Sequence, residues 1–256
     1  GFKHDTIKAL SHNILLCSVE LLCETRGKLL PDPEHDAILA CCYCFAKSGT
    51  ASKASERQGV ILIADRTEQQ QPGVEVVDTE TKLIQQVVNL VRYHDPDILL
   101  GWEVQRSSWG YLLKRAKVVC DRQYRLHCEL SRLVPSQPGD PRHFNDDWGA
   151  KKDSDIHIVG RLVFNVWRLM RAELTLSSYS LQNVAWHTLR LRVPNYKPYA
   201  TCSWLKNGAP STRAKALEYG LRCVTTTLDV LEHLDFVNRT SEFARMYGFD
   251  FTSVIT

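Results

Sequence analysis

The chain has 256 residues, a formal net charge of +3 and an isoelectric point near 8.4, with 44% hydrophobic and 24% charged residues. This composition is ordinary for a globular protein, and a chain of this length can bury a large core without a disulfide or a structural metal. Charged residues interrupt the apolar runs within about ten residues, which excludes a membrane span of about 20. The mild basic excess permits nucleic-acid contact without indicating it.

The first half of the chain alternates predicted strands and helices. The strand-like segments are 12–20, 37–45, 60–63 and 98–100, with a polar loop expected over 46–58 and a turn at Pro72-Gly73. Apolar residues from Leu83 to Val91 recur with helical spacing, which predicts a helix from Thr79 to Tyr93. A second helix is predicted over 107–119.

The second half is predicted to be mainly helical after a long surface loop. Residues 135–155 combine prolines, glycines and many charges, which is typical of such a loop. Helices are then expected over 166–172, 180–189, 212–235 and 239–247. Together these elements predict one α/β domain over residues 1–256, with a mixed sheet flanked by helices. Because the chain begins at Gly1, we expect it to be part of a longer polypeptide.

Cys41, Cys42 and Cys44 crowd one segment of a chain that has nine cysteines. A zinc site is one interpretation, but zinc ligands usually come as spaced Cys or His pairs, which this sequence lacks. The surrounding segment is almost wholly apolar, so we expect these thiols to be small buried side chains. The cysteine usage favours a reducing compartment.

Three segments resemble the exonuclease region of B-family DNA polymerases, in the same order along the chain. The first, Asp95 to Ala116, has an acidic-Pro-Asp start, a Gly-aromatic pair and a Tyr-Leu-x-x-Arg-Ala end. The second, Val159 to Val184, is similar to the family's Gly-Arg strand and the Ser-Tyr-x-Leu helix after it. The third, Phe236 to Gly248, looks like the stretch leading toward the polymerase palm. Trp109-Gly110 resembles the zeta branch of the family in particular.

The resemblance implies a ribonuclease-H-like fold of the DnaQ-type 3′-5′ exonucleases. It also implies a parent DNA polymerase that copies damaged DNA in the nucleus, with palm, fingers and thumb outside this chain. The implied partners are a DNA primer-template, the accessory subunits of that polymerase and the rest of its chain, with no membrane. Mg²⁺ and an iron–sulfur cluster are implied for the missing regions, and no cofactor or metal is expected here.

An active exonuclease site of this family uses carboxylates to hold two divalent metals, and three motifs supply them. By the resemblance, the Asp-x-Glu motif falls on Ser18 and Glu20, so only the second carboxylate remains. The second motif's Asp falls on Ser108, and its usual Asn on Glu103. The Tyr-x-x-x-Asp motif falls on Tyr219 and Cys223, and Asn165 replaces another usual Asp. We therefore predict a degenerate site without nuclease activity.

Glu20 is expected to accept a hydrogen bond rather than bind a metal, and Tyr219 to be a packing residue. A residual exonuclease using Glu20 and Glu103 is the alternative. Seven basic residues and two acidic ones lie between positions 105 and 132. The basic residues either contact DNA or form a solvated surface. They are Arg106, Lys114, Arg115, Lys117, Arg122, Arg125 and Arg132. A third hypothesis is a protein-interaction domain without DNA contact.

Overall fold

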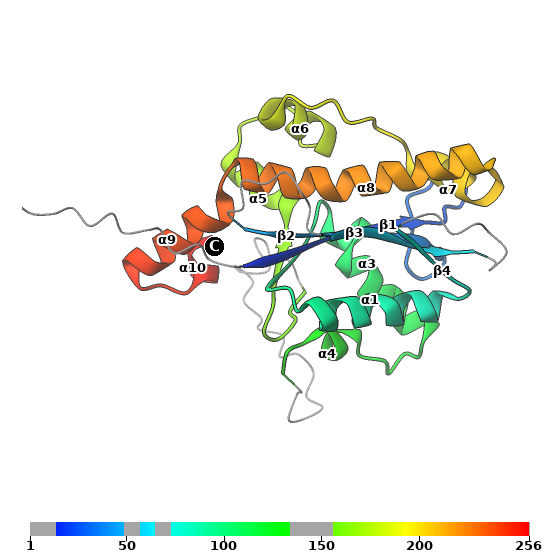
Figure 1. Cartoon of the computed structure of the whole chain (residues 1–256), viewed down its shortest axis with the longest axis horizontal. Helices are drawn as coiled ribbons and strands as arrows, with labels where there is room; N and C mark the ends of the chain where they lie inside the picture. The colour runs from blue at the N-terminus through cyan, green and yellow to red at the C-terminus, as the bar shows by residue number, and fades with distance from the viewer. Residues whose placement is uncertain (1–13, 49–56, 65–72, 134–155, 256) are drawn as a thin grey trace, which may run out of the picture.

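The computed structural model describes residues 14–48, 57–64, 73–133 and 156–255. In these residues a six-stranded sheet with the order β4-β3-β2-β1-β5-β6 lies between two layers of helices (Figure 1). Helices α5, α6, α7 and α8 cover one face of the sheet, and α1, α3 and α4 cover the other. This arrangement is the predicted α/β architecture with a mixed sheet and flanking helices.

The strands are β1 Leu15–Cys23, β2 Ile38–Lys47, β3 Arg57–Ile63, β4 Val74–Val77, β5 Ile98–Gly101 and β6 Leu162–Asn165. The helices of the first half are α1 Glu80–His94, α2 Val104–Ser107, α3 Trp109–Val119 and α4 Leu126–Leu130. Those of the second half are α5 Val166–Glu173, α6 Leu181–Leu189, α7 Pro198–Asn207, α8 Pro210–His233, α9 Phe236–Tyr247 and α10 Phe251–Ile255.

The central strand β1 runs antiparallel to β2 and parallel to β5, and β5 runs parallel to β6. Ser18 lies opposite Leu100, and Gly101 lies opposite Asn165. Residues that follow these points therefore gather where the carboxyl ends of the parallel strands meet. Ligand sites of open α/β sheets form at this edge.

The alternation along β1 divides the core into two. Cys17, Val19 and Leu21 pack toward α1 and α3, whereas Leu16 and Leu22 pack toward α8. Because side chains two residues apart share one face of a strand, Ser18 and Glu20 also face α8. Both positions of the first motif therefore lie opposite α8, the helix that carries the third motif.

Arg161, from the Gly-Arg segment of the resemblance, ties β5, β6 and α4 together. Its Nε donates to the carbonyl oxygen of Leu130 at 2.7 Å, and its guanidinium pairs with Asp95 at 2.8 Å. The side chain is 3% exposed. Gly160 before it has a φ of +81°, a conformation that favours glycine.

Several predicted elements are confirmed, including the helix after Thr79, whose hydroxyl caps α1 by accepting from the backbone N–H of Lys82. The predicted loop over 46–58 is too long, since β2 continues to Lys47 and β3 begins at Arg57. The predicted helix over 107–119 is wrong at its start, because α2 and α3 are separate and meet at Ser108. Strand β4 and helices α4, α7 and α10 were not predicted.

The long loop predicted over 135–155 lies outside the described residues. Among the cysteines, Cys41, Cys42 and Cys44 are fully buried and all nine are free, as expected for thiols used as small apolar side chains. Within the described ranges, no helix has the length and apolar character needed to cross a bilayer.

Candidate functional site

An open cleft of about 430 Å³ lies at the edge where β1 and β5 end, beneath α8. Its walls come from β1, the turn after β5, the start of α6, the segment before α7 and the middle of α8. The residues that line it include Glu20, Trp102, Glu103, Ser107, Tyr196, Tyr219 and Cys223. The cleft thus joins residues from all three motifs of the sequence resemblance.

Glu20 and Glu103 are the two carboxylates of this cleft. Desolvation raises the pKa of Glu20 from an ordinary 4.5 to about 8; a hydrogen bond with the Ser107 hydroxyl opposes this rise, and the nearby charge of Glu103 adds to it. Burial therefore favours the protonated form of Glu20, which is neutral. Glu103 forms an ion pair with Arg106 at 3.4 Å, which directs that carboxylate toward a cation of the chain.

Ser18 and Ser108 lie behind the wall of the cleft and are 1% and 0% exposed. Ser108 Oγ donates to the backbone carbonyl oxygen of Val19 at 2.6 Å. Ser18 Oγ has no hydrogen-bond partner among the described residues. Neither hydroxyl brings a negative charge to the cleft, and the one at Ser108 is committed to the backbone of β1.

Tyr219 and Cys223 face the cleft from one side of α8, as their spacing predicts. They hydrogen-bond to each other, and burial raises the pKa of both groups well above its ordinary range. The Tyr219 ring also packs edge-on against Tyr196, with centroids 5.1 Å apart. Tyr219 is thus held by packing, and Cys223 is an un-ionised thiol at the position of the expected carboxylate.

The donor set does not fit two divalent metals. Such a site needs several charged oxygen ligands, and this cleft offers two carboxylates, Glu20 and Glu103. Asn165, at the end of β6, leaves its buried Oδ1 without a hydrogen-bond partner, and it is neutral. In the part of the chain that the structure describes, no cluster of three or more His, Cys, Asp or Glu side chains could bind a metal.

Neighbouring acids do not replace the lost carboxylates. Glu218 projects into solvent with a 73% exposed side chain and pairs with Arg222 at 3.8 Å. Asp229 lies further along α8 and does not line the cleft. Both placements follow from helix geometry, because residues five positions before and six positions after Cys223 point away from its side of α8.

The predicted basic residues do not all remain available for DNA. Arg115 is 11% exposed and makes a two-pronged ion pair with Glu80, at 2.8 and 2.9 Å. Arg132 pairs with Asp95 and Asp97. Both guanidiniums are thus engaged by carboxylates, as that of Arg106 is by Glu103. The exposed members of the predicted set are Arg106, Lys114, Lys117, Arg122 and Arg125.

Sequence reasoning missed Ser107, Trp102 and Tyr196. The hydroxyl of Ser107 bonds to Glu20, and the two aromatic rings form apolar walls of the cleft. Ser107 adjoins the second motif, so its proximity to the site could have been inferred from that motif. Tyr196 lies in an irregular segment without periodicity, and no sequence pattern indicated its place.

The sheet order, the two helical layers and the cleft at the strand ends define a ribonuclease-H-like domain with an exonuclease-type site. Residues 2–184 match the family described as "DNA polymerase family B, exonuclease domain". The chain belongs to this family, which confirms the resemblance seen in its motifs.

Among curated proteins, the chain is 36% identical to the DNA polymerase zeta catalytic subunits of Mus musculus and Homo sapiens, over 95% of its own length. It is 26% identical to the DNA polymerase delta catalytic subunit of Oryza sativa subsp. japonica, over 91% of its length. The chain spans 8% of the length of the mouse and human relatives and 21% of the rice one.

Proposed function

We propose that this chain is the exonuclease-like domain of a DNA polymerase zeta catalytic subunit and that it has no nuclease activity. The observation that carries this proposal is the chemistry of the cleft. The positions expected to hold metal-binding carboxylates are occupied by Ser18, Ser108 and Cys223, and Glu20 is the one expected carboxylate that is present. Without several anionic oxygens, the cleft lacks the means to hold metals and stabilise charge on a scissile phosphate.

The remaining role is structural. The domain would brace the polymerase part of the chain, guide the DNA primer-template and contact accessory subunits in the nucleus. Loss of proofreading suits an enzyme that extends mismatched or distorted primer ends during translesion synthesis and DNA repair, because an active exonuclease would remove those ends. The Mg²⁺ of polymerisation and an iron–sulfur cluster are proposed for regions outside this chain.

A nuclease assay tests the proposal directly. The chain is incubated with a labelled single-stranded oligonucleotide and Mg²⁺ or Mn²⁺, and 3′-5′ shortening is followed. We expect no cleavage by the natural chain. The triple variant Ser18→Asp, Ser108→Asp, Cys223→Asp restores the expected carboxylates, and metal-dependent cleavage by it would support the motif assignment.

The alternative is a residual metal-dependent exonuclease that uses Glu20 and Glu103, and the presence of both in one cleft is the observation that favours it. Metal-dependent shortening by the natural chain, abolished by Glu20→Gln, would establish this alternative and overturn our proposal. Thermal unfolding with and without Mn²⁺ is a second readout, because a metal bound only by the folded state raises the melting temperature.

A further inference from the structure

The segment that carries α5, α6 and α7 is rich in basic side chains and includes exposed aromatic rings. Residues 156–217 contain nine Lys or Arg side chains and one acidic side chain, Glu173. The basic side chains are Arg161, Arg168, Arg171, Arg190, Arg192, Lys197, Lys206, Arg213 and Lys215.

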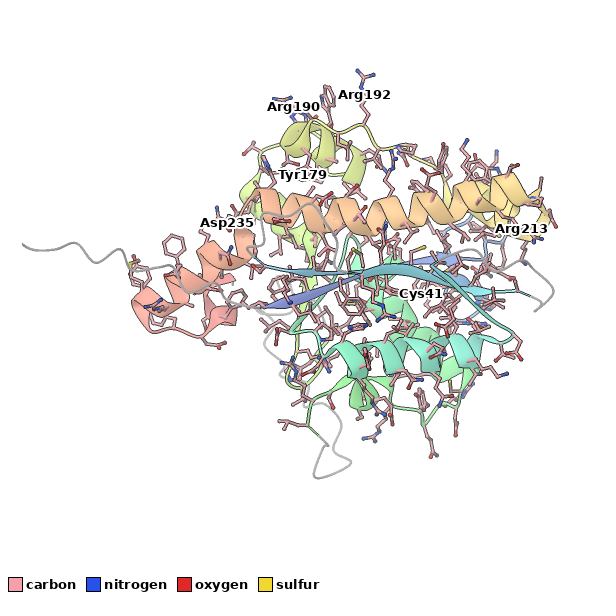
Figure 2. All side chains as sticks on the ribbon, viewed as in Figure 1. Cys41, Tyr179, Arg190, Arg192, Arg213 and Asp235 are labelled. Carbon is pink, nitrogen blue, oxygen red and sulfur yellow. The ribbon has the colours of Figure 1, made fainter. Side chains whose placement is uncertain are left out.

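Two exposed members of this set, Arg190 and Arg192, lie at and just after the end of α6. Figure 2 shows Arg190 and Arg192 extending outward from the end of α6, on the side away from the sheet. Both side chains are exposed, and neither is ion-paired to a carboxylate within the described ranges. Arg190 occupies the αL position that ends α6, with a φ of +57°. The chain turns there, and both guanidiniums extend outward from the end of the helix (Figure 2).

Aromatic rings lie next to these cations. The guanidinium of Arg192 lies over the Trp186 ring, 5.2 Å from its centroid, and Trp186 is 39% exposed. The guanidinium of Arg171 lies 4.9 Å from the centroid of Trp167 and 5.9 Å from that of Tyr179. Tyr179 itself is fixed, because its hydroxyl donates to the carbonyl oxygen of Leu174 at 2.6 Å.

Stacked guanidinium and aromatic planes combine two binding properties. The cations attract phosphates, and the flat surfaces accept an unstacked base of any sequence. An acidic peptide would use the charges but not the planar surface. We propose that the α6 surface, defined as Trp186, Arg190 and Arg192, binds single-stranded nucleic acid. This inference goes beyond the proposed function and does not depend on the loss of nuclease activity.

The α6 surface is separate from the cleft. None of its three residues lines the cleft, whereas Ser180, Leu181 and Gln182 at the start of the same helix do. A strand bound along α6 would therefore run toward the mouth of the cleft without occupying its carboxylates. The α6 surface also lies on the opposite side of the sheet from α3, which carries Lys114 and Lys117 (Figure 1).

The test is binding of fluorescein-labelled oligothymidylate to the full 256-residue chain, followed by anisotropy across a salt series. For Arg190→Gln/Arg192→Gln we expect about tenfold weaker binding at low salt and a salt slope smaller by about 1.4, because each phosphate contact on a single strand contributes about 0.7. Trp186→Ala should weaken binding at least about fivefold, and Trp186→Phe should restore most of it, because base stacking needs the ring.

The matched control is Lys82→Gln/Arg245→Gln, which also removes two positive charges. These two side chains are 53% and 58% exposed and are paired with carboxylates. It should leave affinity and salt slope nearly unchanged. Unaltered binding by Arg190→Gln/Arg192→Gln, or an equal loss in the control, would overturn the proposal. Competition by polyglutamate as strong as that by unlabelled oligothymidylate would also overturn it, in favour of an acidic protein partner. Circular dichroism and melting temperature verify that each variant is folded.

Discussion

The hydroxyl of Ser108 donates a 2.6 Å hydrogen bond to the backbone carbonyl oxygen of Val19, which joins the α2–α3 junction to the central strand. Ser108 is fully buried, and its side chain also lies against Gly101 at the end of β5. The resemblance predicts a metal-binding carboxylate at this position. The residue present, Ser108, instead makes a structural hydrogen bond that links the α2–α3 junction to β1.

Ser108→Asp should destabilise the chain. A carboxylate there would face the carbonyl oxygen of Val19 in a dry environment, so we expect the free energy of unfolding to fall by about 2–4 kcal/mol. Ser108→Ala, which removes only the hydrogen bond, should cost about 1 kcal/mol. Urea unfolding measures both values. Equal stability of the Asp variant and the natural chain would show that the position still tolerates charge.

The stability of the chain should fall with rising pH because of Glu20. Its pKa is about 8 in the folded chain against an ordinary 4.5, so its contribution to stability is complete below about pH 4.5 and is lost as the pH rises through 8. We expect Glu20→Gln to match the natural chain at acidic pH and to exceed its melting temperature at pH 9. The exposed Glu218→Gln is the control and should show no such pH-dependent gain.

Arg115→Gln should destabilise the chain more than Lys114→Gln does. Arg115 and Glu80 have side chains that are 11% and 13% exposed, and removing the cation leaves a poorly solvated carboxylate. The expected loss is about 2–4 kcal/mol of unfolding free energy, against less than about 0.5 kcal/mol for the exposed Lys114. Chemical denaturation gives both values. A loss of DNA affinity without a loss of stability in Arg115→Gln would instead indicate that this arginine contacts DNA.

Gly220 allows α8 to approach the sheet, and Gly220→Ala should be destabilising. A methyl group at this position would overlap the Sγ of Cys42 on β2, so we expect a cost of about 1–3 kcal/mol from overpacking. The double variant Gly220→Ala/Cys42→Ala should be more stable than the sum of the two single effects, because the second change removes the obstructing sulfur. Strict additivity in thermal unfolding would contradict this contact.

The sequence alone was sufficient for the features with local or repeating signals. The apolar spacing from Leu83 to Val91 specifies α1, and the Tyr219–Cys223 spacing puts both residues on one side of α8. The loss of carboxylates at Ser18, Ser108 and Cys223 is likewise visible from the sequence, because the surrounding motif frames remain intact. Short elements such as β4 and α4 escaped prediction, since four or five residues contain too little periodicity to detect.

Only the tertiary structure decided the environment of each charged group. Arg115 and Glu80 are 35 positions apart, and no local pattern shows that they meet and withdraw Arg115 from solvent. The raised pKa of Glu20 arises from cleft walls contributed by distant segments, and the pairing of Arg192 with Trp186 depends on the turn at Arg190. Sequence patterns report local backbone preference and apolar faces. Burial and ion pairing depend on which distant segments pack together, and these long-range contacts exist only in the tertiary structure.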